Sequence, residues 1–275
     1  MRRRKQFRLL GICASVGKTV VCGKRSAGHR ILSFSAQHGY STMTHFTLVH
    51  GAWHGAWCWD ALSKILMARG HTVSCITQTG LGERAGELSP DITLQTFVDD
   101  VVAHIQTRDI RDTVLVGHSF GGIAITGASA ALPDRISELV YLDAMVPLSG
   151  VAPRETVAPD VWAARKAGAI MVGETLCLPP PKAIAMGLTD PTEAAYIETR
   201  MTPHPIRTYE TAITFNGLPN NGVPVRYIRV TDPIYPPLES HRQRAVEMGW
   251  PMQDIASGHD CMVNAPQALA DLLQK

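Results

Sequence analysis

The sequence is poor in charge and in aromatic residues, and its cysteines are scattered. Of the 275 residues, 18% are charged and 6% are aromatic, against 45% that are hydrophobic. Low charge with ordinary glycine and proline counts (23 and 18) argues against a disordered chain, a collagen or a coiled coil. The six cysteines form no C-x-x-C pair and need no disulfide framework, so reduced thiols are expected. The composition indicates one large domain with a well-buried core.

Two further absences bear on the partners of the protein. The uncharged run from Thr113 to Pro133 contains several glycines and a His-Ser pair, so it does not indicate a membrane span. Residues 1–42 carry nine basic residues and no acidic ones. Residues 43–275 hold the other 17 basic residues and all 24 acidic residues, so their net charge is −7. An acidic globular part does not indicate nucleic acid as a partner.

Residues 1–42 permit several interpretations. A secretory signal fits poorly because Lys18 interrupts the apolar stretch. The arginines at 3–4 resemble a twin-arginine signal with loose spacing, and the Gly-Lys-Thr at 17–19 resembles a phosphate-binding loop with one residue too many between its glycines. We favour a native start at Met43, with residues 1–42 a disordered extension or not part of the native protein. A cytoplasmic location is then expected, whereas a real targeting signal would mean export.

Local patterns predict alternating strands and helices. Short apolar runs predict six strands, at 45–50, 71–76, 114–117, 139–142, 225–230 and 252–256. Apolar spacing and terminal signals predict helices near 58–69, 94–106, 120–131, 238–248 and 265–274. This alternation predicts an α/β fold whose mainly parallel sheet is covered by helices on both faces.

The alternation stops between about residues 150 and 217. That stretch is rich in proline, alanine and methionine, with helix-like pieces and no predicted strand. We expect it to be a helical lid, inserted after the fourth predicted strand of a domain that spans 43–275. Long excursions of this kind are usually functional.

A glycine-flanked serine, in Gly117-His-Ser-Phe-Gly121, lies between a predicted strand and a predicted helix. A serine on such a tight turn projects its hydroxyl, and the glycines let neighbouring backbone segments pass closely. The helix N-terminus places backbone donors where negative charge would develop. We therefore expect Ser119 to be a nucleophile.

A serine hydroxyl is a poor nucleophile without a base. His259 is the downstream histidine that falls in a loop at a strand end, since His204 lies in the predicted lid and His241 in a predicted helix. We expect His259 to take the serine proton.

Two aspartates could orient that histidine, because Asp143 and Asp232 each follow a predicted strand. Asp232 precedes His259 by one helix and one strand, which suits the chain order serine, acid, histidine. We expect Asp232 to be the partner of His259 and Asp143 to be a structural carboxylate near the serine turn. Asp260, next to the histidine, is expected to point away.

The loop after the first predicted strand should complete an oxyanion hole. Gly51 permits a turn near the serine, so that the backbone N–H of Ala52 can act together with that of Phe120. His50 and His54 are expected to order this loop through hydrogen bonds.

The segments 46–57 and 117–122 and the pair Gly258-His259 resemble the α/β-hydrolase family, in the branch of plant methylesterases, hydroxynitrile lyases and bacterial esterases. The resemblance covers residues 45–275. It implies a Ser119–His259–Asp232 triad, an oxyanion hole from Ala52 and Phe120, and a helical lid over an apolar pocket.

The residues expected to line the pocket lie at the serine turn, in neighbouring loops or in the expected lid: Gly51, Trp53, His118, Met145 and Trp162. No metal-type cluster and no dinucleotide-binding motif stands out, so neither a metal nor a cofactor is expected. The expected partner is a small-molecule ester substrate, and the protein could form a homodimer.

Two positions bear on the reaction within that branch. The resembled hydroxynitrile lyases carry threonine and lysine where this sequence has Gly51 and Asp260. Departing cyanide needs a nearby cation, and a carboxylate would repel it. We therefore expect a serine carboxylesterase acting on a small to medium apolar or aromatic ester. The alternatives are an amide or carbamate hydrolase with the same triad, a hydroxynitrile lyase, and a hydrolase-fold ligand receptor.

A protein that starts at Met43 is expected to fold and function as well as the full chain, because the first convincing strand follows that residue. Thermal unfolding and ester turnover of the two proteins should agree. A lower midpoint for the truncated protein would show that residues 1–42 belong to the fold.

Overall fold

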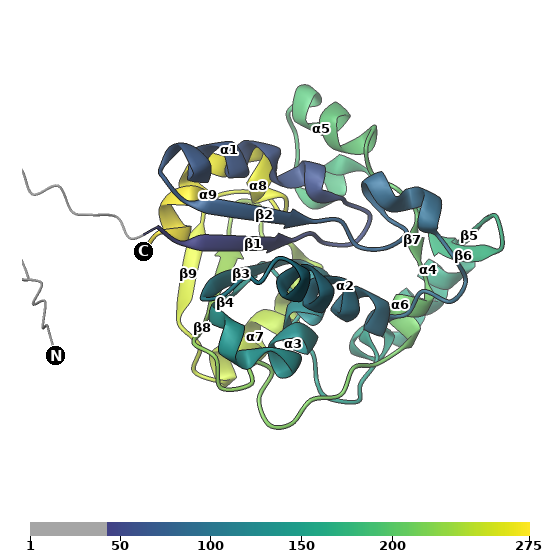
Figure 1. The fold of residues 1–275 in the computed structure, drawn as a ribbon. Helices are drawn as coiled ribbons and strands as arrows, with labels where there is room; N and C mark the ends of the chain where they lie inside the picture. Colours follow the sequence, from purple (N-terminus) through teal and green to yellow (C-terminus); the bar gives the residue numbers. More distant parts are fainter. Residues whose placement is uncertain (1–42) are drawn as a thin grey trace, which may run out of the picture. The chain divides into compact units, whose positions relative to one another are not determined.

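The computed structural model describes residues 43–275, and the expectations for residues 1–42 lie outside them. The main sheet has six parallel strands in the order β2-β1-β3-β4-β8-β9 (Figure 1). Its strands are β1 (His45–Val49), β2 (Thr72–Ile76), β3 (Thr113–His118), β4 (Ile136–Leu142), β8 (Val225–Val230) and β9 (Met252–Ile255). The predicted α/β fold with a parallel sheet of about six strands is confirmed.

Helices connect these strands and cover the sheet. They are α1 (Asp60–Ala68), α2 (Leu94–Thr107), α3 (Gly121–Ala131), α7 (Glu239–Glu247), α8 (Cys261–Asn264) and α9 (Pro266–Leu273). Short 3-10 helices are η1 (Ala56–Trp59), η2 (Gly82–Glu87), η3 (Pro133–Arg135) and η6 (Pro236–Leu238). Helices α1 and α9 lie on one side of the sheet, and α2 and α3 on the other (Figure 1).

The central strand β4 carries apolar side chains on both of its faces, because both faces of the sheet are covered there. In β4, Leu139 and Tyr141 pack with side chains of α2 and α3, whereas Val140 and Leu142 pack with those of α1 and α9. All four side chains are fully buried. Successive side chains of a strand point to opposite faces, so one short apolar run supplies both cores.

Helix α2 has the apolar spacing that its sequence predicts. Its buried side chains recur at three- and four-residue intervals: Leu94, Phe97, Val98, Val101 and Ile105. Each contributes about 1.5–3 kcal/mol to folding by leaving water. The helix begins after Thr93, whose backbone N–H donates to Thr96 Oγ1 at 3.1 Å.

The chain between β4 and β8 forms a cap beyond the carboxyl ends of β1 and β2 (Figure 1). Its helices are η4 (Pro153–Thr156), α4 (Pro159–Ala167), η5 (Ala183–Met186), α5 (Pro191–Glu198) and α6 (Arg207–Glu210). Its strands are β5 (Ile170–Val172), β6 (Thr175–Leu178) and β7 (His204–Pro205), which form an antiparallel sheet.

The expectation that this segment contains no strand is therefore wrong. Strands β5 and β6 are three and four residues long, too short for a clear alternation of apolar and polar residues. A two-residue turn joins them, and Gly173 supplies the positive φ of 57° that such a turn requires.

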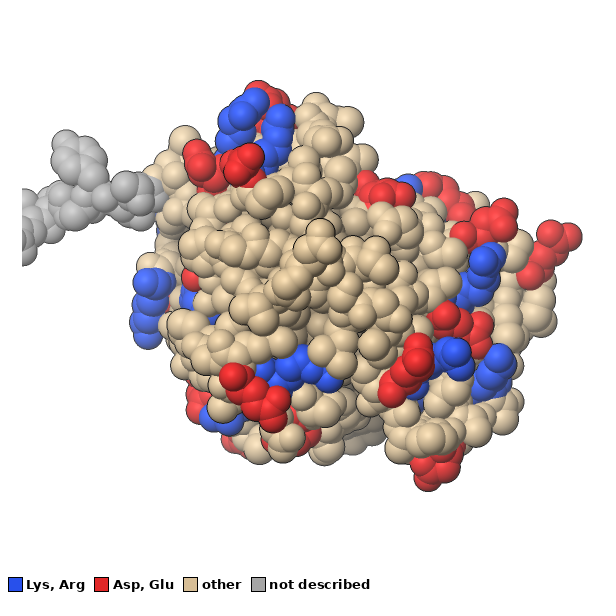
Figure 2. Space-filling view, turned by 90° about the horizontal axis from the view of Figure 1, so that it is seen from below, with Lys and Arg blue, Asp and Glu red and all other residues tan. Residues whose placement is uncertain are grey.

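Charges on the described surface are mixed. On the face shown in Figure 2, uncharged residues cover the centre, while acidic and basic side chains lie beside one another around it. Within the described part of the chain, no helix is long and apolar enough to cross a membrane, and four cysteines are free thiols, as expected: Cys58, Cys75, Cys177 and Cys261.

The crossing of α2 and α3 gives a test of the packing. A Cβ at Gly127 would lie 2.4 Å from Val98 Cγ2, so Gly127→Ala is expected to destabilise the protein by about 1–3 kcal/mol, even though alanine favours a helix. Chemical denaturation measures the loss. Gly86→Ala, where a Cβ meets nothing within 4 Å, is the control and should stay within about 0.5 kcal/mol.

Trimming the neighbour should restore part of that stability. Val98→Ala removes both atoms that a Cβ at Gly127 would meet first, so the double variant is expected to be less destabilised than the sum of the single variants. Simple additivity of the two losses would contradict this account of the helix crossing.

Candidate active site

Ser119 stands on a sharp turn between β3 and α3. Its φ of 53° lies in the left-handed region, which costs a residue other than glycine roughly 1–2 kcal/mol. The turn is held to the end of β4, because Ser119 N–H donates to Leu142 O at 3.2 Å and Met145 N–H donates to Ser119 O at 2.9 Å. Gly121 allows the close approach of the loop after β1, since a Cβ there would lie 2.6 Å from His50 O.

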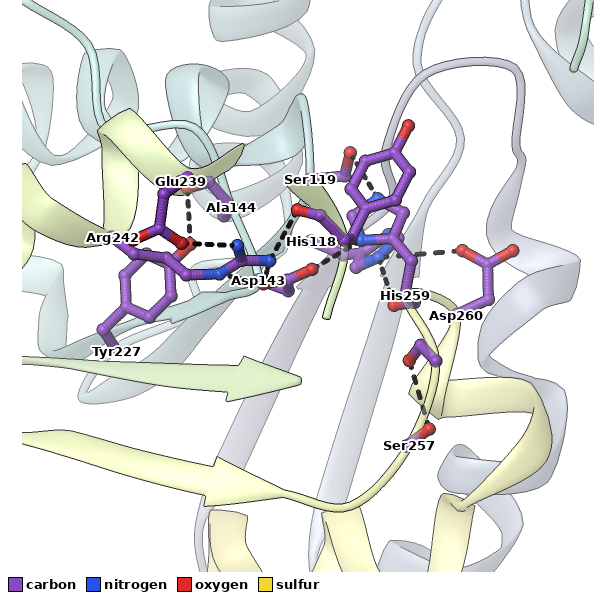
Figure 3. A network of polar contacts seen from close by, with 12 residues as sticks. His118, Ser119, Asp143, Ala144, Tyr227, Glu239, Arg242, Ser257, His259 and Asp260 are labelled. Carbon is purple, nitrogen blue, oxygen red and sulfur yellow. Dashed lines mark hydrogen bonds and ion pairs between the residues drawn. The ribbon is translucent and has the colours of Figure 1, made fainter. Parts of the chain in front are cut away.

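The Ser119 hydroxyl faces His259, and His259 faces Asp143 (Figure 3). His259 Nδ1 lies 2.7 Å from Asp143 Oδ2, and His259 Nε2 lies 2.9 Å from Ser119 Oγ. Because a carboxylate accepts hydrogen bonds, Nδ1 carries the proton and donates a hydrogen bond to Asp143. Nε2 then accepts from the serine hydroxyl, which is the tautomer that a general base needs.

Asp143 is fixed from its other side by Arg242 of α7 (Figure 3). The guanidinium donates from Nη2 at 2.8 Å and from Nε at 3.1 Å to Asp143 Oδ1, and both side chains are buried. Arg242 Nη2 also donates to the backbone carbonyl of Tyr235, whose ring stacks on His259 with centroids 4.0 Å apart. The ion pair balances the buried negative charge and prevents the carboxylate from turning away from His259.

The prediction that Asp232 is the partner of His259 is wrong. Asp232 follows β8, as expected, but its side chain is exposed, and its backbone N–H donates to Ser257 O at 3.2 Å. Asp143 follows β4, which lies directly beside β3 in the sheet. The carboxylate that was expected to be structural therefore holds the position nearest the serine turn.

His50 fixes the peptide that carries the expected oxyanion-hole amide of Ala52. Its Nδ1 donates to Gly51 O at 2.7 Å, and its Nε2 accepts from Gln78 N–H at 3.1 Å. Burial lowers the pKa of His50 to about 4, so the ring is neutral. Since a trans peptide is planar, a fixed Gly51 carbonyl also fixes the opposite direction of the Ala52 N–H.

Asp260 points away from the hydroxyl of Ser119, as expected, and pairs with His54. His54 Nε2 lies 3.1 Å from Asp260 Oδ2, and His54 Nδ1 donates to Ala52 O at 2.7 Å. Burial lowers the pKa of His54, but the charge of Asp260 more than offsets this and raises it above the ordinary value. The expectation that His50 and His54 order the loop through hydrogen bonds is thus confirmed.

Among the described residues, one group of side chains has ligand atoms close enough together to hold a metal ion. The nitrogens and oxygens of His118, His259 and Asp260 lie within 4.8 Å of one another. Most of these atoms already have partners: Asp260 pairs with His54, His118 Nε2 donates to the His259 carbonyl at 3.0 Å, and both ring nitrogens of His259 are engaged. We interpret the group as a hydrogen-bond network.

A cavity of about 370 Å³ opens at Ser119. Its lining comes from the loops after β1 and β4, the serine turn, the cap and the chain at 235–241: Trp53, Ser119, Met145, Thr156, Val157, Ala158, Val161, Arg165, Tyr209, Tyr235, Pro236, Pro237, Leu238 and His241. The volume lies in the lower range of small-molecule sites.

Two of the five expected pocket residues, Trp53 and Met145, line this cavity, and the other three do not. Gly51 packs against Ser119 instead, because a Cβ there would lie 2.8 Å from Ser119 Cβ. The ring of His118 is fully buried against the His259 loop. Trp162 stacks behind a lining residue, Tyr209, with ring centroids 5.9 Å apart.

Sequence reasoning missed Arg242, Tyr235 and Arg165. A signal existed for the first of these, since Arg242 and Ala245 are three residues apart in a predicted helix and share its buried side. An arginine on an apolar helix side needs a buried acid, and Asp143 was available. Tyr235 lies in an irregular segment, and Arg165 lies on the polar helix α4. Neither place has a periodic pattern that would predict a buried or cavity-lining side chain.

A parallel sheet whose carboxyl edge carries a serine, a histidine and a carboxylate beneath a cap defines a class of α/β enzymes. The chain belongs to the alpha/beta hydrolase family, whose model matches residues 48–272.

Similar proteins support an esterase or hydrolase activity. The chain is 33% identical to the carbendazim hydrolyzing esterase of Nocardioides sp. (strain SG-4G) over 242 residues. This match covers 84% of this chain and 98% of that protein. It is 38% identical to methylesterase 2 of Arabidopsis thaliana over 43% of this chain and 48% of that protein. An extracellular alpha/beta-hydrolase from a Paenibacillus species has the same fold, with a TM-score of 0.72, 23% identity, and coverage of 84% of this chain and 97% of that chain.

The choice between the two aspartates can be tested with a fluorophosphonate that labels activated serines. Asp143→Asn is expected to slow labelling of Ser119 by about 10²–10⁴-fold, because the amide no longer holds the reactive tautomer of His259. Asp232→Asn removes the same charge at an exposed position and should stay within about twofold of the wild type.

The measurement needs one control, since Asp143→Asn leaves the buried Arg242 without its charge partner. Circular dichroism and the denaturation midpoint must show that the variant is folded at the labelling temperature. Slow labelling by a folded Asp232→Asn protein, with Asp143→Asn unaffected, would reverse the assignment.

Proposed function

We propose that the protein is a serine carboxylesterase in which Ser119, His259 and Asp143 form the catalytic triad. The observation that carries this proposal is the unbroken chain of hydrogen bonds from Ser119 Oγ through the imidazole to a charge-balanced carboxylate. The family and its esterase relatives support the same class of reaction. The substrate we propose is a small to medium ester with apolar or aromatic parts, since tyrosines, a tryptophan and aliphatic side chains form most of the cavity wall.

The first half of the reaction forms an acyl-enzyme. Ser119 Oγ attacks the carbonyl carbon of the ester while its proton passes to His259 Nε2, and Asp143 stabilises the resulting imidazolium. The carbonyl oxygen becomes an oxyanion, which the N–H groups of Ala52 and Phe120 would bind. Within residues 43–275, neither amide donates to another protein group, so both are available. The alcohol leaves with the proton from His259.

The second half repeats these steps with water. His259 takes a proton from the attacking water, the hydroxide adds to the acyl carbon, and the same two amides hold the oxyanion. Collapse of this intermediate returns the proton to Ser119 Oγ and releases the carboxylic acid.

Hydrolysis remains favoured over cyanide release, although the reason has changed. Asp260 is paired with His54 and does not line the cavity, so its charge no longer argues against cyanide. Gly51 still does, because a side chain there would collide with Ser119 and no threonine hydroxyl can be placed beside the reacting group.

Turnover of a panel of methyl and aryl esters tests the proposal. Ser119→Ala is expected to lower kcat by at least about 10³-fold, because the nucleophile is lost while the cavity remains. Ser240→Ala, which removes an exposed hydroxyl on α7, is the matched control and should keep full activity.

Other outcomes would point to the alternatives. Labelling of Ser119 by a fluorophosphonate without ester turnover would mean an activated serine that cleaves amides, carbamates or cyanohydrins, and released cyanide would identify the last of these. Tight ligand binding with neither labelling nor turnover would contradict the enzyme and favour a receptor.

A further inference from the structure

The cavity at Ser119 contains one charged side chain among its lining residues, Arg165 of the lid helix α4. The other lining groups are apolar or neutral. Burial lowers the pKa of the one lining histidine, His241, to about 4, so it carries no charge at neutral pH. No carboxylate lines the cavity.

Arg165 has no partner among the described residues. No acidic side chain within residues 43–275 pairs with it, and no hydrogen bond from its guanidinium to another described group is formed. The contrast is with its neighbour Lys166, whose Nζ lies 2.8 Å from Glu210 Oε1. Residues 1–42 contain no aspartate or glutamate that could serve instead. A guanidinium stays charged at any ordinary pH, so the cavity has an unbalanced positive charge.

That charge reaches the wall beside the reacting groups. Burial raises the pKa of both Tyr209 and Tyr235, and the positive charge of Arg165 acts on both hydroxyls in the opposite direction. Tyr235 is the ring that stacks on His259. Arg165, Tyr209 and Tyr235 line the same cavity as Ser119, so a substrate whose ester lies at Ser119 shares this cavity with the guanidinium.

We propose that the cavity selects esters that also carry one free carboxylate, such as monoesters of small dicarboxylic acids. Arg165 binds this carboxylate. The proposal rests on the ester hydrolysis proposed above and narrows its substrate class. A planar guanidinium suits a carboxylate because two parallel N–H groups can donate to its two oxygens. The mostly apolar wall would enclose the part of the substrate between the two carbonyl groups.

The experiment compares two nearly isosteric substrates. Monomethyl terephthalate carries the free carboxylate, and methyl 4-carbamoylbenzoate carries a neutral amide in its place; monomethyl suberate and its monoamide give a longer, flexible pair. Arg165→Gln is expected to lower kcat/KM for the carboxylates by about 10–100-fold and to leave the amides within about threefold. Arg165→Lys should retain part of the preference.

Lys166→Gln is the matched control, because it removes the same charge from the same helix without touching the cavity. It should leave the preference for carboxylates unchanged. If Lys166→Gln loses as much kcat/KM on the carboxylates alone, the preference comes from a long-range electric field and not from a contact. If Arg165→Gln loses kcat/KM equally on both members of a pair, Arg165 only shapes the cavity wall. Either result, or a wild type that prefers the amides, overturns the proposal.

A binding measurement separates this proposal from the hydrolysis on which it rests. Calorimetry on the Ser119→Ala protein should show tighter binding of monomethyl terephthalate than of the amide, and Arg165→Gln in that background should abolish the difference. If the wild type cleaves no ester but this difference persists, the proposed reaction fails and the carboxylate site stands. If esters are cleaved and the difference is absent, the carboxylate site fails alone.

Discussion

The turn at Ser119 is the constraint on which the rest of the site depends. A serine at φ 53° is strained, and the backbone of the β4 end holds it there on both sides, through Leu142 and Met145. Two residues, Asp143 and Ala144, lie between these two anchors. The interactions that hold Ser119 in place therefore also set the position of the carboxylate. This explains why the aspartate beside His259 follows β4, which lies next to β3, and not β8, the next strand of the main sheet.

Two adjacent residues then link the Ser119 turn to the loop after β1. His259 turns towards Asp143, while Asp260 turns towards His54, whose other nitrogen holds the carbonyl of Ala52. Each carboxylate is buried and paired, with Arg242 in the first pair and in the second with His54, whose pKa Asp260 raises. Burying charge is favourable only with good geometry of this kind, and the benefit here is orientation rather than stability.

The proximity of Ser119 and His259 was predictable from the sequence, because both residues follow strand ends. Once a parallel sheet is recognised, the order of strands and the turn after each one place Ser119 and His259 without further knowledge. The choice between Asp143 and Asp232 was not predictable in the same way. Both follow strands, and the decision depends on a tertiary contact, the ion pair with Arg242, that supplies a counter-charge to one aspartate and leaves the other in water.

The cavity wall was the least predictable part, and for a related physical reason. It is formed largely by short or irregular pieces of the cap and of the chain at 235–241. The sequence of these pieces has no periodic pattern that would predict which side chains face the cavity. Whether Arg165 faces water or the cavity is decided by how α4 packs, since its neighbour Lys166 has the same charge and pairs with a surface acid instead. Local motifs thus indicate the proposed reaction, whereas the proposed substrate choice depends on the packing of a segment that local motifs do not describe.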